Sequence, residues 1–291
     1  MELADYFIEF PVLFIVVTGI TGLLVGSFLN VVIYRLPVMM QRGWRKDCLE
    51  YLEMPSDTGL PSERFDLVFP NSCCPHCKAT IKPYQNIPVF SYLFLQGKCA
   101  NCHARISLRY PIIEALSGLL SVAVAWHFGV SLQTAFALLL TWSLIALCFI
   151  DIDHQLLPDS IVLPMLWLGL LLSLGGVFAD SHDSILGAIW GYLSLWAVYH
   201  LFKLATGKEG MGYGDFKLLA LFGAWLGWQA LPAVIFLSSL VGAVTGVVMI
   251  VFSGHDRNKP IPFGPYLAAA GWIALMWGDR INDYYSRLTG I

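Results

Sequence analysis

Apolar runs of about 17 or more residues recur along this chain, and each is long enough to cross the roughly 30 Å hydrocarbon core of a bilayer. Hydrophobic residues make up 57% of the 291 positions and charged residues 13%, whereas a soluble domain has roughly 25% charged residues. The sequence therefore predicts an all-α polytopic membrane protein. About eight transmembrane helices are expected, near residues 11–34, 111–129, 131–150, 160–178, 184–203, 216–231, 232–252 and 262–278.

Lys and Arg residues are unevenly distributed between the expected spans. Segment 35–110 holds ten of the seventeen, and the loops near 203–217 and 253–261 hold five more. By the positive-inside rule, these segments are cytoplasmic. The predicted organisation is therefore a first transmembrane helix at 1–34, a cytoplasmic domain at 35–110 and a membrane domain at 111–291.

Four cysteines in the cytoplasmic segment form two C-x₂-C pairs, Cys74 with Cys77 and Cys99 with Cys102, with 21 residues between the pairs. A domain of 76 residues has a thin core and often needs a metal or disulfides to hold it together. Four thiolates in this pattern are typical of a tetrahedral structural zinc site. Disulfides fit a reducing cytoplasm poorly, and a dithiol redox centre at the first pair would leave the second unexplained. The sequence therefore predicts a small zinc-binding domain between the first and second spans.

Two aspartates stand where an apolar run meets a polar loop. Asp151 closes the third expected span and Asp215 opens the sixth, so the predicted topology brings both to the cytoplasmic border. A carboxylate at such a border costs free energy unless it is paired or used, which makes it a functional candidate. Two acids on separate helices suggest a dyad that shares one proton and activates a water. The helix ends suggest that Asp151 carries the proton and that Asp215 is the base.

Each acid also has a purely structural interpretation. Asp215 could be only a helix N-cap, and the glycines that precede it could form only a flexible loop. Asp159 follows Pro158 at the start of the fourth expected span and is best explained as a cap. Asp153 is the rival of Asp151, although on a continuing helix it would face a different side.

The acids belong to a larger pattern. Gly212-Tyr213-Gly214-Asp215 opens a span, and Asp151 lies seven residues before Pro158 at the end of an earlier one. This arrangement resembles the type IV prepilin peptidases. Further motifs match in the same order over nearly the whole chain: Gly26-Ser27-Phe28-Leu29-Asn30-Val31-Val32, the two cysteine pairs, Arg109-Tyr110-Pro111 and Pro262-Phe263-Gly264-Pro265.

The resemblance implies a membrane aspartic endopeptidase of the bacterial inner membrane. Such enzymes cleave the basic leader of type IV prepilins and of type II secretion pseudopilins after a Gly, at the cytoplasmic face. By position, the catalytic acids are Asp151 and Asp215, with Gly212 and Gly214 as the supporting loop. Members with the cysteine domain usually also methylate the new N-terminal residue, with S-adenosylmethionine as donor. The implied partners are prepilin and pseudopilin substrates and membrane lipid, with no nucleic acid.

The methyl-donor site is a separate hypothesis. Gly26, Asn30 and Tyr34 lie four apart on one face of the first expected helix and would face a polar cavity near the zinc domain. Glu114, just inside the second span, is another candidate because it is a buried acid. The structural alternative is helix packing for Gly26 and an interhelical hydrogen bond for Asn30.

Two other classes of protein share part of the pattern. An ion- or proton-coupled transporter could use Asp151 and Asp215, but such sites usually lie near the bilayer midplane between repeats. These acids lie at one border, and no internal repeat is evident. A zinc-bearing assembly protein would need the cysteines but not the acids. Alanine at each acid separates the three classes, because an enzyme loses turnover, a transporter loses flux and a scaffold loses neither.

Overall fold

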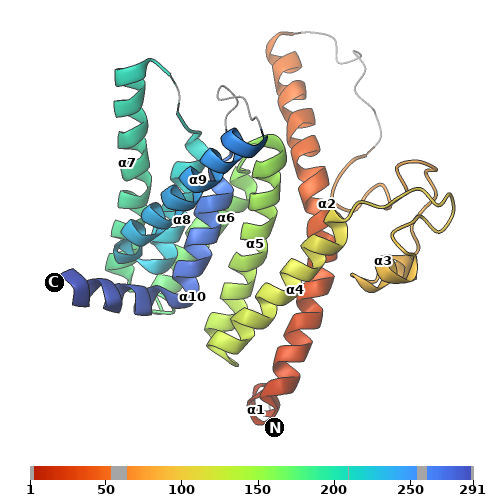
Figure 1. Ribbon diagram of the computed structural model, residues 1–291, viewed down its shortest axis with the longest axis horizontal. Coiled ribbons are helices and arrows are strands. Elements are labelled where there is room, and N and C mark those ends of the chain that lie inside the picture. The colour runs from red at the N-terminus through yellow and green to blue at the C-terminus, as the bar shows by residue number, and fades with distance from the viewer. Residues whose placement is uncertain (1–2, 54–63, 209, 254–260, 290–291) are drawn as a thin grey trace. The chain divides into compact units, whose positions relative to one another are not determined.

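The computed structural model describes residues 3–53, 64–208, 210–253 and 261–289. This part of the chain is built from helices joined by loops, with two isolated β-bridges and no strand (Figure 1). The all-α prediction is confirmed. The α-helices are α1 Leu3–Glu9, α2 Pro11–Tyr51, α3 Phe90–Phe94, α4 Arg109–Phe128, α5 Leu132–His154, α6 Asp159–Ser173, α7 Ser181–Thr206, α8 Tyr213–Leu226, α9 Leu231–Ser253 and α10 Gly264–Thr289, and the 3₁₀ turns are η1 Pro83–Asn86 and η2 Trp228–Ala230.

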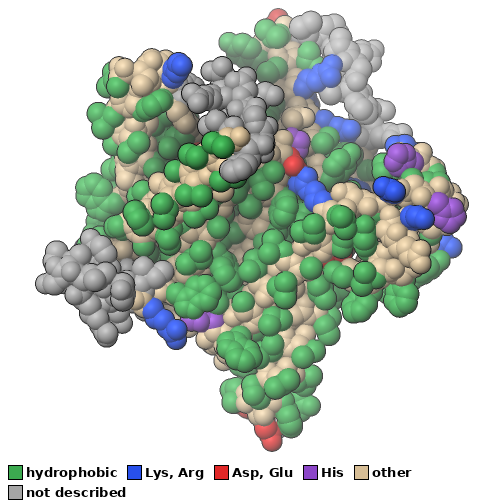
Figure 2. Space-filling view, in the orientation of Figure 1, with side chains coloured by type: hydrophobic (Ala, Val, Ile, Leu, Met, Phe, Trp, Pro, Cys, Tyr) green, Lys and Arg blue, Asp and Glu red, His purple; other side chains and the backbone are tan. Residues whose placement is uncertain are grey.

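By length and composition, five helices of the described chain can cross a membrane: α2, α4, α5, α7 and the segment Trp228–Met249, which joins η2 to α9. Helix α6 is a shorter apolar helix. Large hydrophobic side chains are exposed along these helices, as Figure 2 shows, so the chain is a polytopic membrane protein. Each of the eight expected spans coincides with one of the helices α2 and α4 to α10. The total of about eight spans is compatible with the structure and stays a prediction.

The first span is part of a much longer helix than predicted. Helix α2 has 41 residues and continues through Pro37 to Tyr51, whereas the expected span ended at residue 34. At about 1.5 Å per residue it is roughly 60 Å long, about twice the hydrocarbon thickness. The change in polarity after residue 34 predicts the end of the span, not the end of the helix. Polarity marks the membrane border, but the Met, Gln, Arg and Lys residues that follow are good helix formers and let the helix continue.

By its internal contacts the chain divides into two compact units, Met1–Val130 and Ser131–Ile291, here called unit 1 and unit 2. The division at residues 34 and 110 expected from the sequence stays a prediction. Residues 254–260 lie outside the described residues. They include Arg257 and Lys259, two of the residues on which the predicted membrane orientation depends.

In unit 1, helices α2 and α4 approach through small residues. A Cβ added at Gly26 would lie 2.8 Å from the Cα of Glu114, and one at Gly22 would lie 2.9 Å from the Ser117 carbonyl oxygen. The Ser117 hydroxyl donates a 2.7 Å hydrogen bond to the Gly22 carbonyl. Small residues that let two backbones meet are the usual contact between membrane helices. Gly26 is therefore a helix-packing residue, which was the structural alternative for this position.

The segment 64–108 of unit 1, here called the cysteine module, is tied to α2 and α4 by polar contacts. The buried Arg35 on α2 donates to the carbonyl oxygens of Asp66, at 2.9 Å, and Pro70, at 2.5 Å. Asn86 donates to the hydroxyl of Ser27 on α2 at 3.2 Å. Lys, Arg and His side chains gather over the module in Figure 2. The Val89 N–H donates to the carboxylate of Glu114 on α4 at 2.8 Å. These contacts give a small polar segment fixed points on two apolar helices.

Helix α8 lies at the centre of unit 2, although the span expected for it, 216–231, was the shortest of the eight. Residues Leu218 to Trp225 are all buried. Helix α7 approaches so closely that a Cβ at Gly191 would meet the α8 backbone at 2.7 Å. On another side, the Trp225 indole donates a 2.7 Å hydrogen bond to the Met165 carbonyl of α6. Burial on several sides fixes the position of the residues that begin α8, and Asp215 is one of them.

Candidate active site

Asp151 lies in the last turn of α5, and its carboxyl group points into the protein. The helix ends because Gln155 adopts a left-handed conformation at φ 53°, with its N–H bonded to the Asp151 carbonyl. Asp151 is only 5% exposed. Its Oδ2 accepts a 3.0 Å hydrogen bond from the backbone N–H of Gly264, the first residue of α10. A buried carboxylate needs such a partner, so this contact accounts for part of its desolvation cost.

Asp215 lies in the first turn of α8 and is 7% exposed. The N-cap of α8 is Gly212, so Asp215 is the third helical residue rather than the cap itself. Its carboxylate accepts a backbone hydrogen bond from Gly212, as third-position acids often do. The charge of Asp151 acts on Asp215. The structure therefore brings two buried acids within interaction range of each other.

The rival acids have different surroundings. Asp153 is exposed at the end of α5. Asp159 stands in the first turn of α6, and both its carboxylate oxygens accept from the Lys217 ammonium group at 2.7 Å. Lys217 follows Asp215 by two residues, so this ion pair joins the first turns of α6 and α8. Among the acids of unit 2 considered from the sequence, Asp151 and Asp215 are the buried ones, and the charge of Asp151 acts on Asp215. Their catalytic role stays a prediction.

Leu157, in the loop after α5, packs against the first turns of α8 and α10, where two glycines leave room for it. A Cβ at Gly214 would lie 2.9 Å from the Cβ of Leu157, and one at Gly264 would lie 3.3 Å from its Cδ2. Gly212 is different, since a Cβ there would meet nothing closer than 3.9 Å. Both glycines belong to the expected supporting loop. A side chain at Gly214 would collide with Leu157, whereas a side chain at Gly212 would collide with nothing.

The four cysteines of the module form one cluster. Their Sγ atoms all lie within 4.8 Å of one another, and those of Cys74 and Cys102 are 3.8 Å apart. Zinc bound tetrahedrally at about 2.3 Å would place its sulfur ligands roughly 3.8 Å apart, so the geometry fits that metal. The side chain of Asn101 lies 3.5 Å from the Cys77 sulfur. This hydrogen bond, together with one from the Ala79 backbone, lowers the pKa of the Cys77 thiol and favours the thiolate that a metal binds.

The two cysteine pairs are copies of one structural unit. The Cys74 N–H bonds the Ala79 carbonyl at 3.0 Å, and the Cys99 N–H bonds the Ala104 carbonyl at 2.8 Å. Positive φ angles recur after the second cysteine of each pair, 59° at Lys78 and 57° at His103. The sequence carries the repeat as C-x₂-C-x-A-x-I, so the expectation of no internal repeat is wrong for the cysteine module.

Glu114 of α4 holds a strained turn in the cysteine module. Its carboxylate accepts a 2.8 Å hydrogen bond from the Val89 N–H and another from Ser27 of α2. Val89 has φ 62°, and the Phe90 N–H reaches the Pro88 carbonyl across it at 2.6 Å. A γ-turn centred on a β-branched residue is strained and persists only where its surroundings hold it. Sequence patterns gave no signal for this turn.

The other candidates for the methyl-donor site differ in their surroundings. Asn30 is half-buried, and its side-chain amide donates to the carbonyls of Gly26, at 3.2 Å, and Tyr110, at 3.3 Å. The Tyr110 contact is the interhelical hydrogen bond given above as the structural alternative. Tyr34 is 66% exposed. The assignment of these residues to a methyl-donor site stays a prediction.

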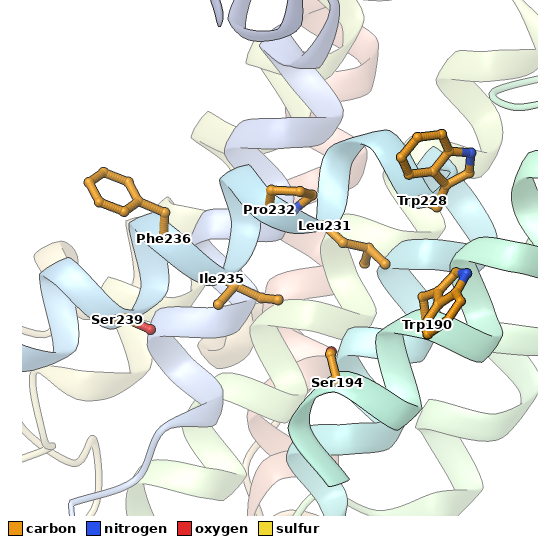
Figure 3. Close-up of a pocket in the computed structure, with 8 residues that line it drawn as sticks. All are labelled: Trp190, Ser194, Trp228, Leu231, Pro232, Ile235, Phe236 and Ser239. Carbon is orange, nitrogen blue, oxygen red and sulfur yellow. The ribbon is translucent and has the colours of Figure 1, made fainter. Parts of the chain in front are cut away.

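An apolar groove of about 550 Å³ lies elsewhere in unit 2, between α7 and the start of α9 (Figure 3). Trp190 and Ser194 of α7 face Trp228 and Leu231 across it. The residues that line it include no acid and no base. It is therefore distinct from the site formed by the two aspartates.

Comparison with known proteins decides the family. A sequence profile of the type IV leader peptidase family matches residues 138–247, and one of the bacterial peptidase A24 N-terminal domain matches residues 20–128. The chain belongs to the type IV leader peptidase family. Membership of this peptidase family argues against the transporter and scaffold alternatives.

Curated members of the leader peptidase family are similar over the full length of the chain. A prepilin leader peptidase/N-methyltransferase of Stutzerimonas stutzeri is 56% identical over 285 residues, which is 98% of each chain. The protein of that name from Pseudomonas aeruginosa is 55% identical over 290 residues, covering 100% of this chain and 99% of its own. That from Legionella pneumophila is 45% identical over 96% of each. No solved structure matches.

Proposed function

We propose that this protein is a prepilin leader peptidase and N-methyltransferase of the bacterial inner membrane. It cleaves the basic leader of type IV prepilins and pseudopilins after a Gly at the cytoplasmic face, and it then methylates the new N-terminal residue. The observation that carries the peptidase proposal is the pair of buried, interacting aspartates Asp151 and Asp215 in unit 2. The methyltransferase proposal rests on the names of the full-length relatives.

The chemistry follows from the two carboxyl groups. Hydrolysis of a peptide needs one ionised carboxylate to take a proton from water and one protonated carboxyl to polarise the carbonyl. The charge of Asp151 acts on Asp215. Two neighbouring carboxyl groups resist ionising together, so the proposed dyad would share one proton, which gives both forms at once. The Gly264 N–H holds one oxygen of Asp151. We expect kcat to depend on pH with a bell-shaped profile set by the pair.

The cysteine cluster is proposed to hold a structural zinc ion. Four protein ligands close the coordination shell, which leaves no position for a catalytic water. When bound, zinc would crosslink the two copies of the repeated unit. Cys73 and Cys48 are exposed and, like Cys148, lie outside the cluster. S-adenosylmethionine is the proposed methyl donor. Within the candidate methyl-donor site, Asn30 and Glu114 are the residues whose side chains make polar contacts.

The proposal is tested directly with purified protein in detergent or lipid, a prepilin bearing its leader, and S-adenosylmethionine. Mass spectrometry of the product should show a new N-terminus directly after the glycine that ends the leader, carrying one methyl group. Omission of S-adenosylmethionine should leave the same N-terminus unmethylated. An intact substrate, or a cut at another bond, would refute the proposed activity.

Replacing Asn30 or Glu114 with alanine is expected to reduce methylation at least about tenfold while leader cleavage changes by less than about twofold. Glu114→Ala removes the acceptor that holds the strained Val89 turn, and Asn30→Ala removes one hydrogen bond from α2 to the Tyr110 carbonyl of α4. Cleavage and methylation are measured on the same samples, by gel shift and by mass spectrometry. Glu50→Ala is the matched control, because Glu50 is an exposed acid on α2. Normal methylation in both variants would remove these residues from the candidate site.

A further inference from the structure

We propose that Gly264 is a positioning residue for Asp151. Its N–H orients the carboxylate, and its lack of a side chain is what allows the contact. The inference rests on the proposed peptidase function, since it concerns how one acid of the catalytic pair is held. Gly264 lies in the Pro262–Pro265 motif, to which neither the dyad nor the metal site assigns a role.

The first observation is the hydrogen bond itself. The Gly264 N–H meets Asp151 Oδ2 at 3.0 Å, and both residues are buried although 113 positions separate them in sequence. Gly264 begins α10, where backbone N–H groups have no partner within the helix. The positive end of the helix dipole therefore also faces this carboxylate. A fixed N–H in a site shielded from water orients a charge at no reorganisation cost.

The second observation is the space around Gly264. A Cβ added there would lie 2.6 Å from Asp151 Oδ2 and 3.1 Å from its Cγ, so any side chain would push the carboxyl group away. Gly264 is not among the glycines with positive φ. The backbone conformation therefore does not require glycine. Of the neighbours that a side chain would meet, Asp151 is nearer than Leu157, whose Cδ2 would lie at 3.3 Å.

The third observation is that α10 is fixed against the helix that carries Asp151. The Trp272 indole donates a 3.0 Å hydrogen bond to the hydroxyl of Thr141 on α5. On its other side, Gly271 packs against the ring of Phe222 on α8. These contacts set the register of α10 against α5 and α8. The N–H at its first residue is thereby held in place for Asp151.

Gly264→Ala is the direct test. We expect kcat for leader cleavage to fall about 100-fold, as a displacement of about 1 Å in a catalytic group can cause, while KM changes by less than about twofold. The matched control is Gly278→Ala on the same helix, because a Cβ at Gly278 has no atom within 4 Å. It should keep full activity. Unchanged kcat in Gly264→Ala would overturn the proposal.

A second comparison separates positioning from general crowding. The added methyl group would also lie 3.3 Å from Leu157 Cδ2. If crowding against Leu157 were the cause, the double variant Gly264→Ala/Leu157→Ala would recover the kcat of Leu157→Ala alone. We expect no recovery, because Asp151 Oδ2 is still displaced. Recovery to within about threefold would overturn the proposal.

A measurement without turnover covers the case in which Gly264→Ala does not fold. The exchange rate of the Gly264 amide hydrogen is compared between the wild-type protein and Asp151→Ala. Loss of the acceptor should accelerate exchange at Gly264, whereas amides in the middle of α9 should be unaffected. Equal exchange rates at Gly264 would overturn the proposal. A wild-type protein that fails to cleave prepilin would instead refute the proposed function, and the exchange result would still decide whether the contact exists.

Discussion

Replacing Asp151 or Asp215 with asparagine will lower kcat for leader cleavage by at least about 10³-fold, because each carboxyl group is needed as an acid or a base. Asparagine keeps the size of the side chain and can still accept the Gly264 N–H, but it cannot ionise. The loss should therefore fall on kcat rather than on substrate binding. Single-turnover cleavage of prepilin by each purified variant measures it.

The controls for this prediction lie on the same chain. Asp153→Asn changes an exposed acid two residues from Asp151 and should leave cleavage within about twofold of wild type. Methyl transfer to a precleaved substrate should survive in both dyad variants, which would show that they fold. If Asp151→Asn still cuts, Asp153 becomes the partner to test. Cleavage by both dyad variants would rule out the aspartic mechanism.

The sequence predicted the membrane helices and the pair of acids for the same physical reason. Long apolar runs and the placement of cations are local signals, and together they put Asp151 and Asp215 at one predicted border. Burial then separated these acids from Asp153 and Asp159, which hydropathy alone could not do. Hydropathy did not show how far α2 continues beyond the expected span, because loss of hydrophobicity does not end a helix whose residues still favour one.

The features that the sequence did not predict are long-range contacts. The hydrogen bond between Gly264 and Asp151 joins residues 113 positions apart, and no local pattern encodes it. The position of Asp151 at the end of α5 predicts that this acid carries the proton, but the N-terminus of α10 beside it supplies a dipole of the opposite sign. The helix ends therefore no longer distinguish the two acids. Val89 was missed for the same reason, since its turn is held by Glu114 from another helix.

Replacing Cys74 with serine will abolish zinc binding, whereas replacing the adjacent Cys73 will not. Cys74 is buried and contributes its sulfur to the cluster, while Cys73 is exposed and lies outside it. Metal analysis of purified protein should give one zinc per chain for wild type and for Cys73→Ser, and none for Cys74→Ser. Zinc retained by Cys74→Ser, or lost equally from Cys73→Ser, would show that the cluster is not the metal site.

Loss of the metal should unfold the cysteine module. A structural zinc site contributes about 10–16 kcal/mol in small zinc-binding peptides, which is as large as the whole stability of a typical domain. The module has few buried apolar residues of its own, and Cys74 is one of them. Limited proteolysis should therefore cut within residues 64–108 of Cys74→Ser and of chelator-treated wild type, but not of Cys73→Ser. A module that stayed resistant to protease without zinc would owe its stability to the contacts of Arg35 and Glu114 instead. The two aspartates lie in unit 2, outside the module.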